Sequence, residues 1–164
     1  MRKISIVASQ PIKRHIGSDI IMYFLKTNYS HVSWVFWDKS EKNQFYYECV
    51  LMGGVKFTGK LYWLSRNNIM FTQNFMVSDD VYDQFLKEAM DKCGEEYSLL
   101  QNAGIQIAKW YKLAKNVFGN GNDRSNCSEL IYSFKDKVGL KIDGDPDLIS
   151  PKDIVEACKK MQTT

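Results

Sequence analysis

Two neighbouring stretches of β-branched and aromatic residues constrain the fold more than any other part of the chain. Residues 31–37 read His-Val-Ser-Trp-Val-Phe-Trp, and residues 44–51 read Gln-Phe-Tyr-Tyr-Glu-Cys-Val-Leu after a short polar stretch. Runs of this composition on either side of a polar loop predict two strands that pair as an antiparallel hairpin. We therefore expect a sheet organised around these two strands.

The order of the other segments predicts the fold class. Further strands are predicted over residues 3–8, 55–57, 60–64 and 69–77, with one early helix that Ser18 or Asp19 caps and that buries residues 20, 21, 24 and 25. From Ser78 onward the spacing of apolar residues becomes helical, and helices are predicted to begin after Ser78, at Tyr97, at Cys127 and at Pro151. Strands followed by a run of helices predict one α+β domain over residues 1–164, an antiparallel sheet with helices packed on one side.

The helix that begins at Cys127 is the most informative of these segments. Apolar residues recur at helical spacing behind it, at Leu130, Ile131, Phe134 and Val138. Asn126 suits the N-cap position, and Glu129 is placed to complete a capping box. Cys127 then lies in the first turn, where unpaired amides and the helix dipole favour a thiolate. A cysteine on an apolar stripe is also a common small core residue, so this helix alone leaves both interpretations open.

A histidine and a glutamate in the predicted hairpin give Cys127 possible partners. His15 lies in a polar stretch and is interpreted as a surface residue, whereas His31 opens a strand and could be structural or functional. Glu48 lies inside an aromatic strand, where a carboxylate needs a partner. Because a short loop joins the two strands, His31 and Glu48 are predicted to be neighbours. The apolar stripe of the Cys127 helix faces this sheet, so the three side chains can converge.

Composition excludes several classes of protein. The chain is 45% hydrophobic and 13% aromatic with a net charge of only +3, which predicts a packed globular protein and argues against nucleic acid as a partner. The four cysteines form no C-x-x-C pair, and neither a zinc spacing nor a complete calcium loop is present, so we expect no metal and no cofactor. The sequence predicts no signal peptide, no transmembrane segment and a cytoplasmic location.

The chain resembles the circularly permuted branch of the NlpC-type papain-like cysteine hydrolases, which includes lecithin–retinol acyltransferase-like proteins and small bacterial, phage and poxvirus proteins. The resemblance covers residues 4–160 and rests on the order of short motifs, in which the histidine strand precedes the cysteine helix. These motifs are Ser30-His31-Val32-Ser33, Glu48 before Gly54-Val55, Tyr97, Asn126-Cys127-Ser128-Glu129-Leu130-Ile131 and Ser150-Pro151-Lys152-Asp153-Ile154. It implies a permuted papain-like fold and is compatible with a phage or viral origin.

The resemblance also implies a function. Cys127 would be the nucleophile, His31 the base and later the acid, and Glu48 the residue that orients His31. Tyr97, Asn126 and Ser128 are expected to contact the substrate, an amide or ester such as a peptide, a peptidoglycan stem or a lipid acyl group. One alternative is a non-catalytic module that binds a lipid, peptide or glycan, and another is a host-interaction protein for which the fold is only a scaffold.

Overall fold

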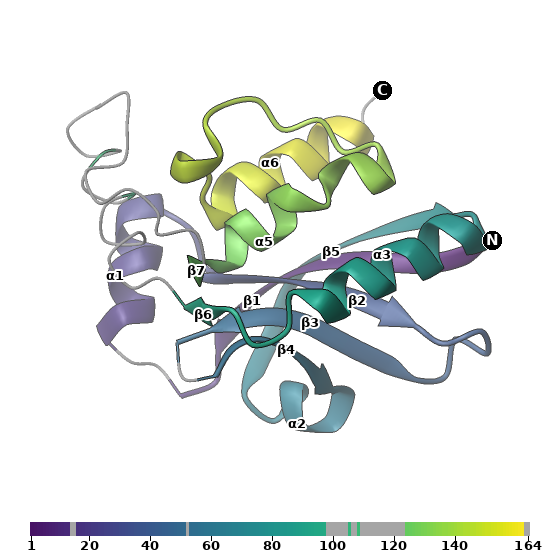
Figure 1. The fold of residues 1–164 in the computed structure, drawn as a ribbon. Coiled ribbons are helices and arrows are strands. Elements are labelled where there is room, and N and C mark those ends of the chain that lie inside the picture. Colours follow the sequence, from purple (N-terminus) through teal and green to yellow (C-terminus); the bar gives the residue numbers. More distant parts are fainter. Residues whose placement is uncertain (14–15, 52, 98–104, 106–107, 109–123, 163–164) are drawn as a thin grey trace.

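The first strand, β1 (Arg2–Pro11), lies inside a five-stranded antiparallel sheet of order β4-β3-β2-β1-β5 (Figure 1). This computed structural model describes residues 1–13, 16–51, 53–97, 105, 108 and 124–162. β1 pairs on one side with β2 (His31–Trp37) and on the other with β5 (Asn67–Val77). Residues 4–8 of β1 are all buried, because both faces of this inner strand are covered.

The predicted hairpin is present as β2 and β3 (Gln44–Val50), and β4 (Gly54–Gly59) completes that edge of the sheet. The β2–β3 ladder pairs Trp34 with Tyr47 at one end and Trp37 with Gln44 at the other. The first residues of β2 and the last residues of β3 therefore lie beyond the ladder. A separate two-stranded parallel sheet joins β6 (Glu96–Tyr97) to β7 (Arg124–Ser125).

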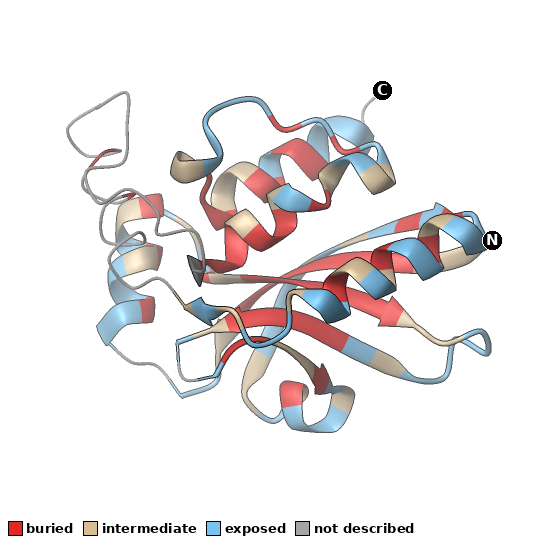
Figure 2. Cartoon of the chain, viewed as in Figure 1, coloured by how far each residue is buried: buried red, intermediate tan, exposed pale blue. Residues whose placement is uncertain are grey.

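Helices cover both faces of the main sheet. Their bounds are α1 Ile16–Leu25, α2 Lys60–Leu64, α3 Asp79–Asp91, α5 Cys127–Ser133 and α6 Pro151–Gln162, with 3₁₀ turns at Lys135–Val138 and Pro146–Leu148. α3, α5 and α6 pack through their buried residues on one face, and α2 packs on the opposite face (Figures 1 and 2). The predicted α+β class with an antiparallel sheet is confirmed, while the prediction that the helices lie on one side only is wrong.

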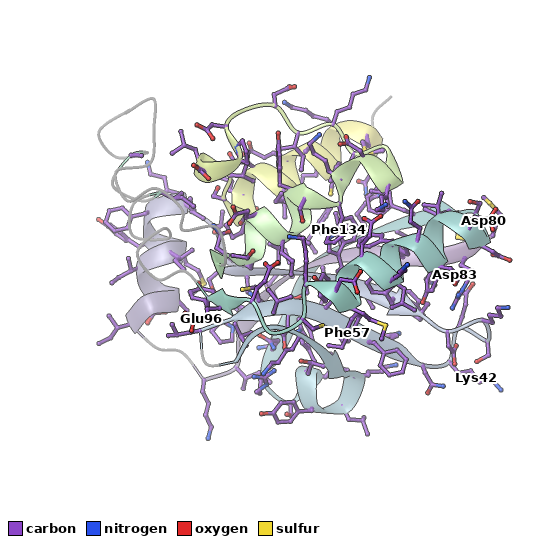
Figure 3. The ribbon with its side chains drawn as sticks, viewed as in Figure 1. Lys42, Phe57, Asp80, Asp83, Glu96 and Phe134 are labelled. Carbon is purple, nitrogen blue, oxygen red and sulfur yellow. The ribbon has the colours of Figure 1, made fainter. Side chains whose placement is uncertain are left out.

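The larger core is aromatic and joins the sheet to the helices. Phe36 of β2 meets the rings of Tyr47, Phe57 and Phe85 at centroid separations of 4.9–6.4 Å. The ring of Phe85 on α3 stacks in turn on Phe134, which follows α5, at 4.5 Å. Phe57 and Phe134, labelled in Figure 3, thus reach one core from β4 and from the end of α5. This packing fixes α5 against the sheet.

The predicted strand over residues 60–64 is instead the helix α2. A strand would place alternate residues on one face, but this turn buries only Trp63 and leaves Leu61 and Tyr62 mostly exposed. Trp63 stacks on Tyr46 with ring centroids 4.0 Å apart and planes inclined by 12°. A single turn of helix delivers this one large side chain to the sheet, and tertiary packing therefore overrides the local β propensity of the segment.

Two further helix predictions need correction. The early helix α1 begins at Ile16, so Ser18 lies within its first turn and is not its cap, and the buried residues include Ser18 and Met22, whereas Ile20 is exposed. Tyr97 belongs to strand β6 and does not begin a helix, because its backbone pairs with Ser125 of β7. Most of the long helix predicted after Tyr97 lies outside the described residues, as does His15. Among the described residues, no helix combines the length and apolar character needed to cross a bilayer.

Candidate active site

The candidate site lies where β2 and β3 separate, beyond the Trp34–Tyr47 pair that ends their ladder. The start of α5 packs against this opening. The Cys49 thiol of β3 donates to the carbonyl oxygen of Ser125 at 3.1 Å, and the indole N–H of Trp34 donates to the carbonyl oxygen of Leu130 at 3.4 Å. These contacts hold the beginning of α5 beside the ends of both strands.

The capping box predicted at Asn126 is present and sets where α5 begins. The Asn126 side-chain oxygen accepts hydrogen bonds from the backbone N–H groups of Ser128 and Glu129, each at 2.9 Å. Glu129 Oε2 accepts in return from the Asn126 backbone N–H at 3.4 Å. Caps of this kind stabilise a helix by about 1 kcal/mol and fix its first residue. Cys127 is therefore held at the first helical position.

Three groups donate hydrogen bonds to the Cys127 sulfur: the His31 side chain, the backbone N–H of Val32 and the Ser128 hydroxyl. Burial disfavours the thiolate, but these hydrogen bonds and the positive charge of His31 outweigh it and lower the pKa of Cys127 below its ordinary value of 9.0. The thiol is only 5% exposed. Val32 lies beyond the β2–β3 ladder, which leaves its N–H directed at the sulfur rather than at a partner strand.

His31 connects the sulfur to a buried carboxylate. Its Nε2 lies 3.1 Å from Glu48 Oε2 and 3.2 Å from the Ser33 hydroxyl, so Nδ1 is the nitrogen left to face Cys127. Burial alone would lower the pKa of His31, but the hydrogen bonds and negative charges of Cys127 and Glu48 raise it to about 10. The shifts of Cys127 and His31 have a common cause, an ion pair between a thiolate and an imidazolium.

Glu48 is buried and both of its oxygens are fully used. Besides His31, the donors are the Thr58 hydroxyl at 2.7 Å, the Trp63 indole N–H at 2.9 Å and an Arg66 guanidinium N–H at 3.1 Å. Burial raises the pKa of a carboxyl, but these hydrogen bonds and the charges of His31 and Arg66 hold the pKa of Glu48 at about 2. Glu48 is therefore ionised and rigidly held, which fixes the orientation of the imidazole ring.

Thr58, Trp63 and Arg66 were not found from the sequence. They come from the end of β4, from α2 and from the turn that follows α2, and each is ordinary in its local context. The one available signal was Glu48 itself, since a carboxylate in an aromatic strand requires several donors. That signal gives the need for partners but not their positions in the sequence.

The three predicted substrate-contacting residues lie near Cys127 but differ in what they touch. Ser128 is buried, and its hydroxyl bonds to the Cys127 sulfur. Asn126 is fully buried as the N-cap. Tyr97 is half-buried, and burial together with the nearby charges of Cys127 and Cys49 raises its pKa. The structure thus brings all six predicted site residues into one region.

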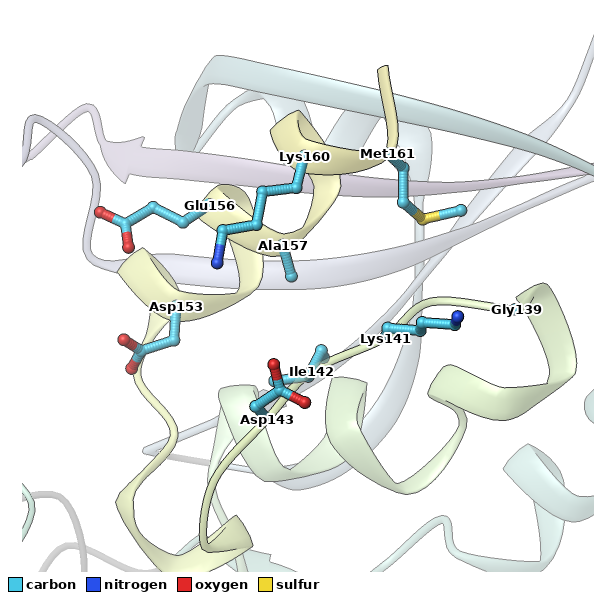
Figure 4. A pocket seen from close by; sticks show the side chains of 9 residues that line it. All are labelled: Gly139, Lys141, Ile142, Asp143, Asp153, Glu156, Ala157, Lys160 and Met161. Atoms are coloured by element: carbon cyan, nitrogen blue, oxygen red, sulfur yellow. The ribbon is translucent and has the colours of Figure 1, made fainter. Parts of the chain in front are cut away.

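A cavity elsewhere in the molecule does not belong to this site. It has a volume of about 480 Å³ and lies between α6 and residues 139–143, lined by Gly139, Lys141, Ile142, Asp143, Asp153, Glu156, Ala157, Lys160 and Met161 (Figure 4). None of the six predicted site residues lines it, so its mixed acidic and basic wall takes no part in the chemistry at Cys127.

Comparison with known proteins bears on the fold. No family model and no curated protein matches the chain. Among solved structures, the crystal structure of metalloprotein yiiX (DUF1105) from Escherichia coli O157:H7 is similar, with a TM-score of 0.62 and 15% sequence identity over 95% of this chain and 92% of that chain. At this identity the similarity shows a shared fold alone.

This comparison corrects the family suggested by the motifs. The similar structure is that of a DUF1105 protein, which points to a different family from the NlpC-type hydrolases. Two of the motifs misled because they have a local structural cause. The residues around Cys127 form a capping box, and Ser150 and Asp153 bond to each other at the start of α6. Helix-start patterns of this kind recur in unrelated proteins, so their order was weak evidence for a family.

Proposed function

We propose that this protein is a cysteine-dependent hydrolase or acyl-transfer enzyme that acts on an amide or an ester. Cys127 is the nucleophile, His31 is the acid and base, and Glu48 orients His31. One observation carries the proposal: the His31 ring bonds to the Cys127 sulfur and also, through Nε2, to Glu48. A nucleophile, a base and a residue that orients the base are the three parts that such chemistry requires.

The proposed reaction follows from the ion pair. The Cys127 thiolate attacks the carbonyl carbon, a C–S bond forms, and the electron pair of the C=O bond moves to the oxygen. When the intermediate collapses, the bond to the leaving group breaks, and the His31 imidazolium gives its proton to the departing amine or alcohol. An acyl thioester remains on Cys127. Neutral His31 then takes a proton from water, or from an acceptor alcohol or amine, which attacks the thioester and releases the thiolate.

Glu48 supports this cycle without taking a proton itself. Its pKa of about 2 keeps it ionised throughout the neutral range, and its Oε2 stays paired with the His31 ring. The negative charge stabilises the imidazolium that exists before attack and again when the acyl-enzyme is hydrolysed. Because Thr58, Trp63 and Arg66 hold the carboxylate from other directions, the ring is kept in one orientation while its protonation state changes.

A metal centre fits these residues poorly. Metalloprotein yiiX shares the fold, but the described part of this chain contains no group of three histidine, cysteine or acidic side chains that could hold a metal ion. Glu48, the carboxylate bonded to His31, already accepts four hydrogen bonds, so it has no free lone pair for a cation. The proposed mechanism therefore uses only side chains and the backbone.

The chain order of the site is also consistent with a circularly permuted papain-like arrangement, which we propose as the finer description of the fold. His31 and Glu48 come from early strands and Cys127 from a late helix. In an unpermuted papain-like chain the cysteine helix comes first. What supports the permuted arrangement is that the Cys127 sulfur, the imidazole and the orienting carboxylate meet despite this reversed order.

Alkylation by iodoacetamide tests the proposal directly. A Cys93→Ala background removes the one thiol that is exposed, and intact-protein mass spectrometry follows the reaction at pH 7. We expect a single rapid modification that Cys127→Ala abolishes. The control Cys158→Ala should leave it unchanged, because burial raises the pKa of that thiol. Rapid modification that persists in Cys127→Ala would refute the assignment of the nucleophile. An alkylated protein with no esterase or amidase activity would favour a binding module.

A further inference from the structure

The side-chain nitrogen of Asn126 is a buried donor that finds no acceptor among the described residues. Asn126 is fully buried, and it directly precedes the proposed nucleophile. The orientation of its carboxamide is not ambiguous, since the oxygen accepts from the backbone N–H groups of both Ser128 and Glu129. The nitrogen must therefore point away from these amides. Buried donors without a partner are uncommon in folded proteins, and each calls for an explanation.

The backbone N–H of Cys127, the next residue, is a second donor without an acceptor among the described residues. The N–H groups of Ser128 and Glu129 bond to the Asn126 side chain, and the N–H of Leu130 bonds to the Asn126 carbonyl oxygen at 3.0 Å. The Leu130 bond is the first within the helix, and four amides before it, those of residues 126–129, have no partner within the helix. Side chains satisfy three of these four, because the Asn126 N–H bonds to Glu129 Oε2 in addition to the bonds of Ser128 and Glu129. The remaining amide is that of Cys127, and it has no hydrogen-bond acceptor within the described parts of the chain. Two donors without an acceptor among the described residues thus belong to consecutive residues, the second of which carries the sulfur.

We propose that Asn126 Nδ2 and the Cys127 backbone N–H together bind the carbonyl oxygen of the substrate as it becomes an oxyanion. This inference rests on the proposed function. When the Cys127 sulfur bonds to the carbonyl carbon, negative charge develops on an oxygen one bond from that carbon. Two N–H donors on consecutive residues, the second of which is the nucleophile, are suited to stabilise that charge. The inference depends on the unpaired carboxamide and not on the dipole of the short helix α5.

Asn126 thus has two separable tasks. Its oxygen caps α5, and its nitrogen binds the oxyanion. Asn126→Ser keeps a side chain that caps helices well but removes the nitrogen donor. Asn126→Asp keeps the shape and the capping oxygen and replaces the donor with an acceptor. If either variant fails to fold, as judged by circular dichroism, the other still provides the measurement.

Two reactions of Cys127 separate these tasks. Alkylation by iodoacetamide displaces iodide and develops no oxyanion, whereas acylation by p-nitrophenyl acetate passes through a tetrahedral oxyanion and releases p-nitrophenolate. We expect Asn126→Ser to change the alkylation rate by less than about twofold and to slow acylation by about 10²–10³-fold, the usual effect of losing one oxyanion donor. The same substitution at the exposed Asn43, Asn43→Ser, should change neither rate.

The outcomes distinguish the two proposals. Normal alkylation and normal acylation in Asn126→Ser and Asn126→Asp would overturn the role of Asn126 and leave the proposed function intact. Equal losses in both reactions would show that Asn126 only positions the nucleophile, which also overturns the inference. If the parent protein, without any substitution at Asn126, is alkylated at Cys127 but is never acylated, both the proposed acyl chemistry and the oxyanion site are overturned.

Discussion

Replacing Glu48 with Gln is the most demanding test of the candidate site. Gln has nearly the same size and shape, so the substitution leaves no cavity. It removes the negative charge, however, and it turns one of the two oxygens into a donor. Oε2 faces the His31 ring and the Trp63 indole N–H, which are both donors when His31 is protonated. The amide of the introduced glutamine therefore cannot satisfy all four groups that donate to Glu48.

The pKa of Glu48 gives the size of the expected effect. The ordinary value is 4.5 and the folded protein holds it at about 2. Since one pH unit corresponds to about 1.4 kcal/mol, the ionised carboxylate contributes about 3 kcal/mol to the free energy of unfolding at neutral pH. For a protein of this length the corresponding fall in Tm is about 6–12 °C. The side chain is 1% exposed, so solvent screening does little to reduce this value.

The dependence on pH follows from the sign of the shift. Because the pKa is lower in the folded state, the stabilisation is complete above pH 4.5 and is lost as the pH falls toward 2. About half of it should remain at pH 3. The difference in unfolding free energy between the parent protein and Glu48→Gln should therefore be largest at pH 7 and clearly smaller at pH 3.

Urea denaturation at both pH values measures this difference. Glu41→Gln is the matched control, because Glu41 pairs with Lys3 at 2.9 Å but is about half exposed, and such surface pairs contribute only about 0–1 kcal/mol. A loss below about 1 kcal/mol for Glu48→Gln at pH 7 would refute the reasoning. The same loss at pH 7 and pH 3 would show that packing, and not the charge, is responsible.

Two other sites give further predictions. Gly54→Ala should lower the unfolding free energy by at least about 2 kcal/mol in urea denaturation, because Gly54 has φ +59° and a Cβ would lie 2.0 Å from the Glu95 carbonyl oxygen. The control Gly59→Ala should change the unfolding free energy by no more than about 0.5 kcal/mol, because a Cβ there meets nothing within 4 Å. His31→Gln should slow iodoacetamide alkylation of Cys127 at pH 7 at least about tenfold. It should also move the midpoint of the pH profile of alkylation from below 9 to above 9, because burial then raises the pKa of the thiol without an imidazolium to oppose it. An unchanged pH profile would contradict the ion pair. In the parent protein the His31–Cys127 pair should leave the unfolding free energy nearly independent of pH between 6.5 and 9, because the proton that folding adds to His31 is matched by the proton that folding removes from Cys127. A fall in stability in urea denaturation that begins at pH 6.5 would contradict the ion pair.

The sequence predicted those elements whose causes are local. The Ser78 hydroxyl accepts from the Val81 N–H at the start of α3, as the acidic first turn suggested, and Asn126 forms the predicted capping box. The hairpin of β2 and β3 followed from composition and from its polar loop. Residues 60–64 could not be assigned correctly, because the helical turn is stabilised by the stacking of Trp63 on Tyr46, and that contact depends on packing between distant segments.

The candidate site was predictable only in part for the same reason. The convergence of Cys127, His31 and Glu48 followed from one helix start and one hairpin, although the family inferred from their order was wrong. The donors of Glu48 could not be deduced, since Thr58 and Arg66 belong to the end of β4 and to the turn after α2. The orphan nitrogen of Asn126 was also beyond reach, because a sequence shows that a residue can cap a helix but not which of its atoms remain unused.

The separation of β2 and β3 beyond Trp34 and Tyr47 has a consequence for how the protein matures. Residues 31 and 48 belong to the first third of the chain, so an imidazole and its carboxylate partner are synthesised long before residue 127 leaves the ribosome. A nascent or truncated polypeptide that stops before α5 carries this pair but no nucleophile. The reactive centre is thus assembled only when α5 packs beside the ends of β2 and β3. The reactivity of Cys127 should therefore develop late, in a single step that marks the completion of folding.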